Sequence, residues 1–104
     1  MAPPPRELLS AALRVKWERG PAEESHAVDL LANRAPGFGA EQYQEASQRA
    51  AALDGTAFEL AAEWFAGRGQ TAFPQEEQLE SRHPGFAPAD YAEAIKNNVL
   101  WARK

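Results

Sequence analysis

The sequence contains no cysteine. This excludes disulfide frameworks, thiolate metal sites and thiol nucleophiles together. It also lacks any run of about 20 consecutive apolar residues, the length a membrane-spanning helix needs. The first residues include three consecutive prolines and no apolar core of a signal peptide. We therefore expect a cytoplasmic protein with no membrane partner.

Clustered positive charge is missing as well. The 104 residues carry 11 Lys and Arg against 15 Asp and Glu, a formal net charge of -4, and the basic residues are scattered along the chain. Because nucleic acids are bound through clustered cations, we expect no nucleic-acid partner. Alanine is abundant and Arg outnumbers Lys by eight to three. We associate this bias with bacteria of GC-rich genome.

β-branched residues are few, and no stretch alternates apolar and polar residues as a half-buried strand would. Helical spacing is present instead. Leu9, Leu13 and Trp17 lie at i, i+4 and i+8, which places them on one helix face. The sequence therefore predicts an all-α fold.

An internal repeat is the strongest pattern in the chain. Residues 31–46 and 79–94 match at eight of sixteen positions with a constant offset of 48. The matches are Leu31/Leu79, Arg34/Arg82, Pro36/Pro84, Gly37/Gly85, Phe38/Phe86, Tyr43/Tyr91, Glu45/Glu93 and Ala46/Ala94. Upstream, Leu13, Trp17 and Gly20 recur as Leu60, Trp64 and Gly67 at an offset of 47. The pattern indicates a tandem duplication of one unit.

We therefore expect a single domain over 1–104, a compact bundle of about six short helices formed by two tandem three-helix units in a pseudo-twofold relation. Residues 1–5 form an extended leader, 6–53 the first unit and 54–104 the second. A helix break is predicted at Asp54-Gly55, with Thr56 and Glu59 as the capping box of the next helix. One unit alone would bury too little surface, so the two should share a core.

The repeated R-x-P-G-F segment is predicted to connect helices. In the first copy, Gly37 permits a turn with positive φ. Phe38 precedes the helix and Tyr43 falls at its fourth position, which is the spacing of a hydrophobic staple. The second copy has the same residues at Gly85, Phe86 and Tyr91. These residues are explained by stopping, turning and stapling helices.

Two Glu-x-x-His steps are candidate metal ligands, Glu23 with His26 and Glu80 with His83. On helices such steps help to form the di-iron carboxylate sites of ferritin-like bundles. However, the two steps are not equivalent under the repeat, and His83 precedes a proline and should leave its helix. A metal-binding or small-ligand enzyme on the bundle is therefore the alternative hypothesis, and no cofactor is otherwise expected.

Other catalytic signatures are missing. No serine lies in a G-x-S-x-G turn, and no glycine-rich phosphate loop is present. The sequence favours a protein–protein interaction or structural module without catalytic activity, with a protein partner or self-association as a homodimer. Trp101 is a candidate binding residue because it replaces Leu53 of the first copy. Arg34 and Arg82, beside the P-G-F turns, are candidates for binding carboxylates of a partner.

Overall fold

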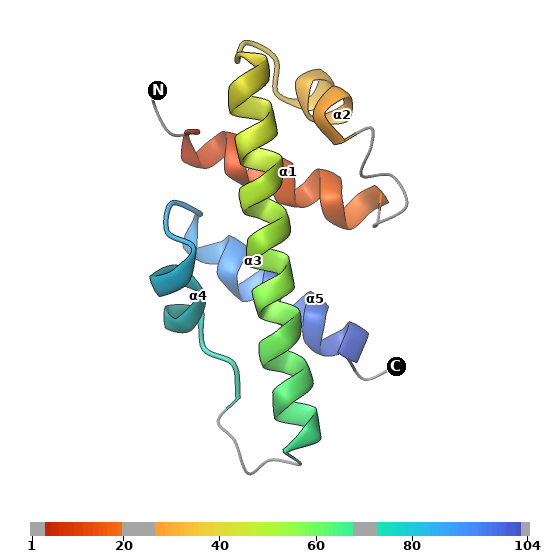
Figure 1. Cartoon of the computed structure of the whole chain (residues 1–104), viewed down its shortest axis with the longest axis vertical. Helices are drawn as coiled ribbons and strands as arrows, with labels where there is room; N and C mark the ends of the chain where they lie inside the picture. The colour runs from red at the N-terminus through yellow and green to blue at the C-terminus, as the bar shows by residue number, and fades with distance from the viewer. Residues whose placement is uncertain (1–3, 20–26, 68–72, 103–104) are drawn as a thin grey trace. The chain divides into compact units, whose positions relative to one another are not determined.

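The computed structural model describes residues 4–19, 27–67 and 73–102, and the regular structure in these ranges is helical throughout (Figure 1). The helices are α1 (Arg6–Arg19), α2 (Ala27–Arg34), α3 (Ala40–Ala66), α4 (Glu76–Arg82) and α5 (Pro88–Ala102). The all-α prediction is confirmed for this part of the chain. None of the described helices is both long and apolar enough to cross a membrane.

The predicted break at Asp54-Gly55 is wrong. Helix α3 runs without interruption for 27 residues, from Ala40 to Ala66, so the described ranges contain five helices rather than about six. An apolar stripe crosses the predicted break, because Leu53, Ala57 and Ala61 follow one another at helical spacing and are fully buried. A glycine inside a helix lowers the stability of the helix by only about 1 kcal/mol relative to alanine. The burial of these three side chains outweighs that cost.

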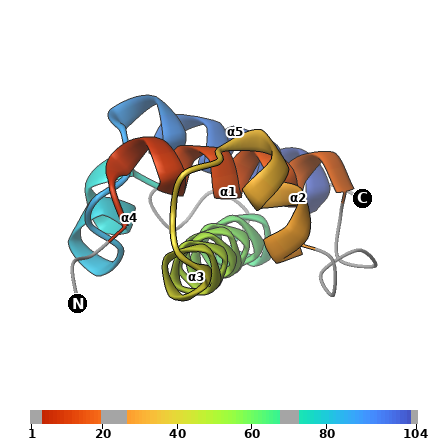
Figure 2. The same cartoon turned by 90° about the horizontal axis from the view of Figure 1, so that it is seen from above.

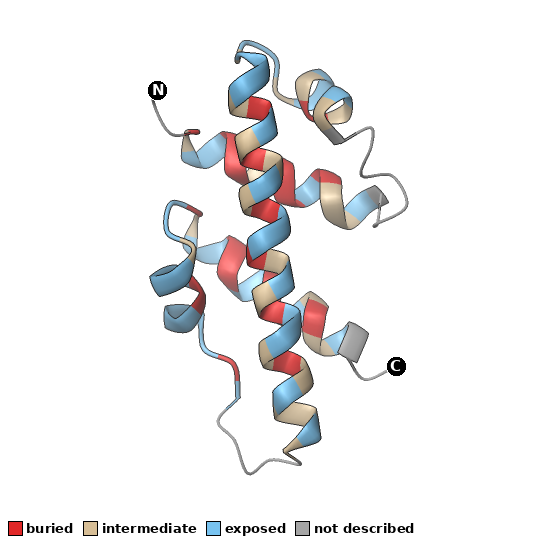
Figure 3. Cartoon of the chain, in the orientation of Figure 1, coloured by how far each residue is buried: buried red, intermediate tan, exposed pale blue. Residues whose placement is uncertain are grey.

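The chain forms two compact units, Met1–Ala51 and Ala52–Lys104, and α3 contributes a part to each. In the first unit, α1 packs against α2, and both lie on the same side of α3 (Figure 2). The buried apolar residues of this unit are Leu8, Leu9, Ala12, Leu13, Val15, Leu31, Tyr43, Ala46 and Ala50. In Figure 3 the buried residues of this unit appear as red segments of α1, of α2 and of the first part of α3.

The second unit consists of the rest of α3 with α4 and α5, and α4 packs against α5. Its buried apolar residues are Leu53, Ala57, Ala61, Leu79, Phe86, Tyr91, Ala94 and Ile95. Two polar residues are buried with them. Asp90 Oδ2, at the third position of α5, accepts a hydrogen bond from the Ala87 amide at 3.2 Å, which is one half of a capping box, while Asn98 Nδ2 donates to Asp54 Oδ1 at 2.8 Å. The latter bond ties α5 to α3.

The start of α1 is fixed by Pro5. Of residues 1–5, the structure describes Pro4 and Pro5, and neither is helical. Pro4 is buried, and the Pro5 carbonyl accepts hydrogen bonds from the amides of Leu8 at 3.0 Å and Leu9 at 3.1 Å. The Pro5 carbonyl thereby closes the first turn of α1, and residues 1–3 of the predicted leader lie outside the described residues.

Candidate functional site

The repeated connector forms a defined hydrogen-bonded loop in the first unit. The Tyr43 hydroxyl donates to the Ala35 carbonyl at 2.7 Å and accepts from the Phe38 amide at 3.2 Å. The rings of Phe38 and Tyr43 meet edge to face with centroids 6.0 Å apart, and Gly37 has a φ of 105°. The predicted staple and positive-φ turn are confirmed here. We call this arrangement, a tyrosine hydroxyl bridging the ends of its own loop, the tyrosine clasp.

The second unit contains the same clasp. The Tyr91 hydroxyl donates to the His83 carbonyl at 2.7 Å and accepts from the Phe86 amide at 3.2 Å. The ring centroids of Phe86 and Tyr91 are 5.9 Å apart, and Gly85 has a φ of 104°. The residues that recur in both copies therefore hold two loops closed.

Arg34 and Arg82, the predicted carboxylate-binding pair, have different surroundings. Arg34 Nη2 lies 2.7 Å from Glu18 Oε1 and 2.6 Å from Glu18 Oε2. This hydrogen bond raises the pKa of the Arg34 guanidinium, against a smaller opposing effect of burial. The pair borders a hollow of about 280 Å³ that Val15 and Leu30 also line. Arg82 is exposed in the last turn of α4. Arg34 thus already holds a carboxylate of its own chain.

The predicted metal ligands are only partly described. Glu23 and His26 lie outside the described residues, and Glu80 is exposed on α4. His83 Nε2 lies 2.8 Å from the Thr56 hydroxyl of α3. Burial lowers the pKa of the His83 imidazole, and the charge of Arg82 lowers it further. Within the described ranges, no three His, Asp or Glu side chains converge as a metal site.

Thr56 therefore has a different role from the predicted one. It lies inside α3 and is not the cap of a new helix. Its hydroxyl anchors the connection between α4 and α5 through His83. The remaining predicted binding residue, Trp101, belongs to the last turn of α5, and its side chain lies outside the part that the structure describes.

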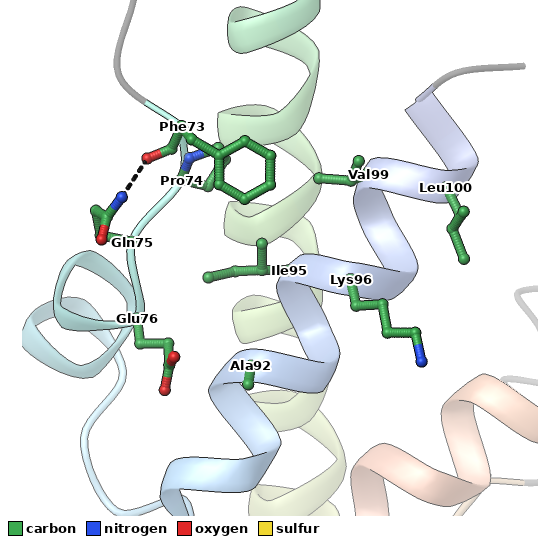
Figure 4. A pocket seen from close by; sticks show the side chains of 9 residues that line it. All are labelled: Phe73, Pro74, Gln75, Glu76, Ala92, Ile95, Lys96, Val99 and Leu100. Carbon is green, nitrogen blue, oxygen red and sulfur yellow. Dashed lines mark hydrogen bonds between the residues drawn. The ribbon is translucent and has the colours of Figure 1, made fainter.

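An apolar groove lies between the segment that precedes α4 and the exposed side of α5 (Figure 4). Its volume is about 490 Å³. It is lined by Phe73, Pro74, Gln75, Glu76, Ala92, Ile95, Lys96, Val99 and Leu100. We call it the α4–α5 groove. Phe73 and Leu100 remain 43% and 49% exposed, whereas Ile95 is buried in the unit.

The wall of the groove that carries Phe73 is held by specific contacts. The ring of Trp64, from α3, meets the Phe73 ring edge to face with centroids 4.9 Å apart. Gln75 Nε2 donates to the Phe73 carbonyl at 2.9 Å, and the Gln75 amide donates to Gln78 Oε1 at 2.9 Å. Pro74 between them is buried. The Phe73 ring is therefore held on the surface by its contact with Trp64, and the Phe73 backbone is held by its hydrogen bond with Gln75.

The groove lies where the two copies differ. At the offset of 48, its α5 residues Ile95, Lys96, Val99 and Leu100 correspond to Ser47, Gln48, Ala51 and Ala52, and Phe73 corresponds to Ser25. At Ile95, Val99, Leu100 and Phe73 the second copy thus has a large apolar residue where the first has a small or polar one, whereas Lys96 and Ala92, which correspond to Gln48 and Gln44, do not follow this pattern. Sequence reasoning missed Phe73 and Leu100. The signal that could have found them was this difference between copies.

Two opposite charges border the groove. Glu76 lies on the α4 side and Lys96 on the α5 side, and both are exposed (Figure 4). The described residues provide no ion-pair partner for either. No family model, curated protein or solved structure matches this chain.

Proposed function

We propose that this chain is a protein–protein interaction module and that its docking surface is the α4–α5 groove. The observation that carries the proposal is the exposure of Phe73 and Leu100 beside an apolar hollow of about 490 Å³. Large apolar side chains that gather around a groove on a small domain are typical of interaction sites. Trp101 follows Leu100 directly in the sequence, and we include it as a proposed contact residue.

The support of Phe73 favours binding. A surface aromatic that is already held in place loses little conformational entropy when a partner covers it. Phe73 is held by Trp64 and by the hydrogen bonds of Gln75. Aromatic residues in desolvated pockets commonly supply much of the binding energy at interfaces. Phe73 is therefore the residue that we expect to matter most for affinity.

The chemistry of the groove also favours binding over catalysis. Of its lining residues, Glu76 and Lys96 are the titratable ones, and they stand on opposite sides. A catalytic site needs a nucleophile or acid near a base that orients it. The groove offers apolar contact with a charge at each edge, which is the composition of a docking surface.

We further propose that the chain arose by duplication and that the copies have divided their tasks. The matching clasps of Tyr43 and Tyr91 support a common origin, because both hydroxyls bond the equivalent carbonyl and the equivalent amide. Positions that the copies share build the unit. Positions that differ, in the second copy, form the groove.

Photo-crosslinking in living cells of the source organism tests the proposal. A photoreactive phenylalanine analogue replaces Leu100 in one strain and Ala52 in a control strain. Ala52 is exposed and corresponds to Leu100 in the first copy. We expect a crosslinked protein product from position 100 only, identified by mass spectrometry. Identical products from both positions, or no product from position 100, would overturn the proposal.

A further inference from the structure

We propose that the occupant of the α4–α5 groove is the same groove of a second copy of this chain, joined to the first about a twofold axis. This inference rests on the proposed function and names its partner. In such a contact the same patch serves both copies, so a patch that binds itself must be complementary to itself. The shape and the charges of the groove both meet this condition.

The shape provides hollow and projection together. Ile95 and Val99 of α5 lie on the inner side of the groove, and Phe73 and Leu100 stand at its edges (Figure 4). A twofold rotation brings the projecting side chains of each copy over the hollow of the other. A volume of about 490 Å³ has room for more than one large apolar side chain. Each copy would therefore cover the exposed apolar residues of its counterpart.

The charges are also self-complementary. Glu76 and Lys96 lie on opposite sides of the groove (Figure 4). A twofold axis that runs along the groove, midway between these two residues, places Glu76 of one copy opposite Lys96 of the other, and the reverse pair follows from symmetry. One contact would thus form two ion pairs from side chains that have no ion-pair partner among the described residues.

The backbone beside the groove argues against an extended peptide as occupant. Strand addition needs free amide and carbonyl groups along an edge. Pro74 has no amide proton, the Gln75 amide donates to Gln78, and the Phe73 carbonyl accepts from Gln75. These three backbone positions of the segment before α4 therefore cannot pair with an added strand, and the segment offers side chains to a partner.

Sedimentation of the full chain over a concentration series tests the inference. The series should run from about 1 µM to about 1 mM, because small interfaces bind in this range. We expect the mass to rise from monomer to dimer. The variant Leu100→Ser should remain a monomer throughout. The matched control is Phe58→Ser, since Phe58 is 47% exposed in the same unit and does not line the groove. It should dimerise like the original chain, and circular dichroism checks that both variants stay helical.

A charge exchange tests the symmetry. The single variants Lys96→Glu and Glu76→Lys should each weaken self-association by about tenfold, because each places like charges opposite each other twice. The variant with both changes should regain the original dimerisation. A mixture of the two single variants should form a heterodimer, since every facing pair is then opposite in charge.

The outcomes separate this inference from the proposed function. A chain that stays monomeric over the whole series overturns the inference, and the proposed function then stands or falls on a crosslink from position 100 to a different protein. Equal loss of dimer in Phe58→Ser and Leu100→Ser overturns the placement at the groove. A mixture of the charge variants that forms no heterodimer overturns the twofold pairing. A position-100 crosslink between two copies supports both proposals.

Discussion

Tyr91 has two tasks within one loop. Its ring packs edge to face on Phe86, and its hydroxyl both donates and accepts a hydrogen bond. The side chain is 1% exposed, so water has little access to the groups that it bonds. A buried amide or carbonyl that loses its partner keeps the full cost of its desolvation. The hydroxyl should therefore contribute more to the free energy of unfolding than a group that makes one hydrogen bond.

We predict that Tyr91→Phe lowers the free energy of unfolding by about 1 to 3 kcal/mol, because the Phe86 amide and the His83 carbonyl lose their partner. Urea unfolding followed by circular dichroism measures this. The equivalent change Tyr43→Phe should act in the same direction, since its hydroxyl makes the equivalent bonds. Unchanged stability in both variants would mean that the hydroxyl hydrogen bonds of the clasps do not stabilise the fold.

His83 should make stability depend on pH. Its pKa in the folded chain is lowered by burial, and the unfolded chain has the ordinary value. The unfolded state therefore binds more protons at acid pH, and stability falls as the pH drops through about 6.5 toward the lowered folded value. Comparing urea unfolding between about pH 8 and about pH 5 measures the slope across the ordinary histidine pKa.

The matched variant for this slope is His83→Ala, which places the first copy's Ala35 at the equivalent position. It loses the contact with Thr56 and should be less stable at neutral pH. Its stability should nevertheless fall less steeply with acid than that of the original chain. An unchanged slope would show that His83 does not titrate differently in the two states.

At this scale the sequence predicted much of the loop. Gly37 and Phe38 have the predicted conformation and packing because short-range rules decide both. The hydroxyl of Tyr43 was missed, since the staple pattern concerns only the ring. Its partner Ala35 lies eight residues earlier and comes into reach only when the loop has closed.

At the scale of elements, α3 shows a local signal overridden by packing. Asp54-Gly55 is a common turn sequence and predicted a break. The spacing of Leu53, Ala57 and Ala61 keeps one helical phase across it, and all three are buried. Asp54 also receives the hydrogen bond of Asn98, which fixes it within the helix. Neither burial nor this distant partner can be read from the dipeptide.

A substitution at Gly55 distinguishes a helix from a turn, because the change in the free energy of unfolding has opposite signs in the two cases. It is exposed inside α3, and an added Cβ would meet nothing within 4 Å. We predict that Gly55→Ala raises the free energy of unfolding by up to about 1 kcal/mol, because alanine is the better helix former. Thermal and urea unfolding of the purified variant measure the change.

The control for this change is Gly37→Ala, whose φ of 105° suits glycine. It should lower the free energy of unfolding by about 1 to 2 kcal/mol, although the added Cβ also meets open space. A destabilising Gly55→Ala of similar size would indicate a turn at Asp54-Gly55 and would contradict the continuous helix.

At the scale of the whole molecule, one helix serves two cores. Tyr43, Ala46 and Ala50 are buried in the first unit, and Ala57 and Ala61 in the second. A unit of about half of this chain buries a small fraction of its surface and is therefore only marginally stable alone. Loss of either core would therefore remove packing that holds its part of α3 helical.

We expect a single unfolding transition as a result. Variants that retain only Trp17, in the first unit, or only Trp64, in the second, with the other tryptophans replaced by phenylalanine, report each unit by fluorescence. The two urea midpoints should agree once differences in total stability, measured by circular dichroism, are subtracted. Separate midpoints, or a circular dichroism transition in two steps, would show that the units unfold independently.

The groove illustrates what sequence reasoning could not reach. Helical spacing places Ile95, Asn98 and Val99 on one face of α5, and Ile95 and Asn98 are buried as this spacing predicts. Phe73 comes from an extended segment more than twenty residues earlier, and its exposure depends on how that segment packs beside Trp64. Helical periodicity contains no information about such a segment.

The tyrosine clasps should slow amide hydrogen exchange. The amides of Phe38 and Phe86 lie in loops, where amide protons usually exchange through small and frequent local openings. Each is instead bonded to a phenol oxygen, so its proton can exchange with deuterium only after the clasp opens. One proton therefore reports the opening of each clasp, and protection factors that both equal the value set by global unfolding are expected if the two loops open only when the whole chain unfolds.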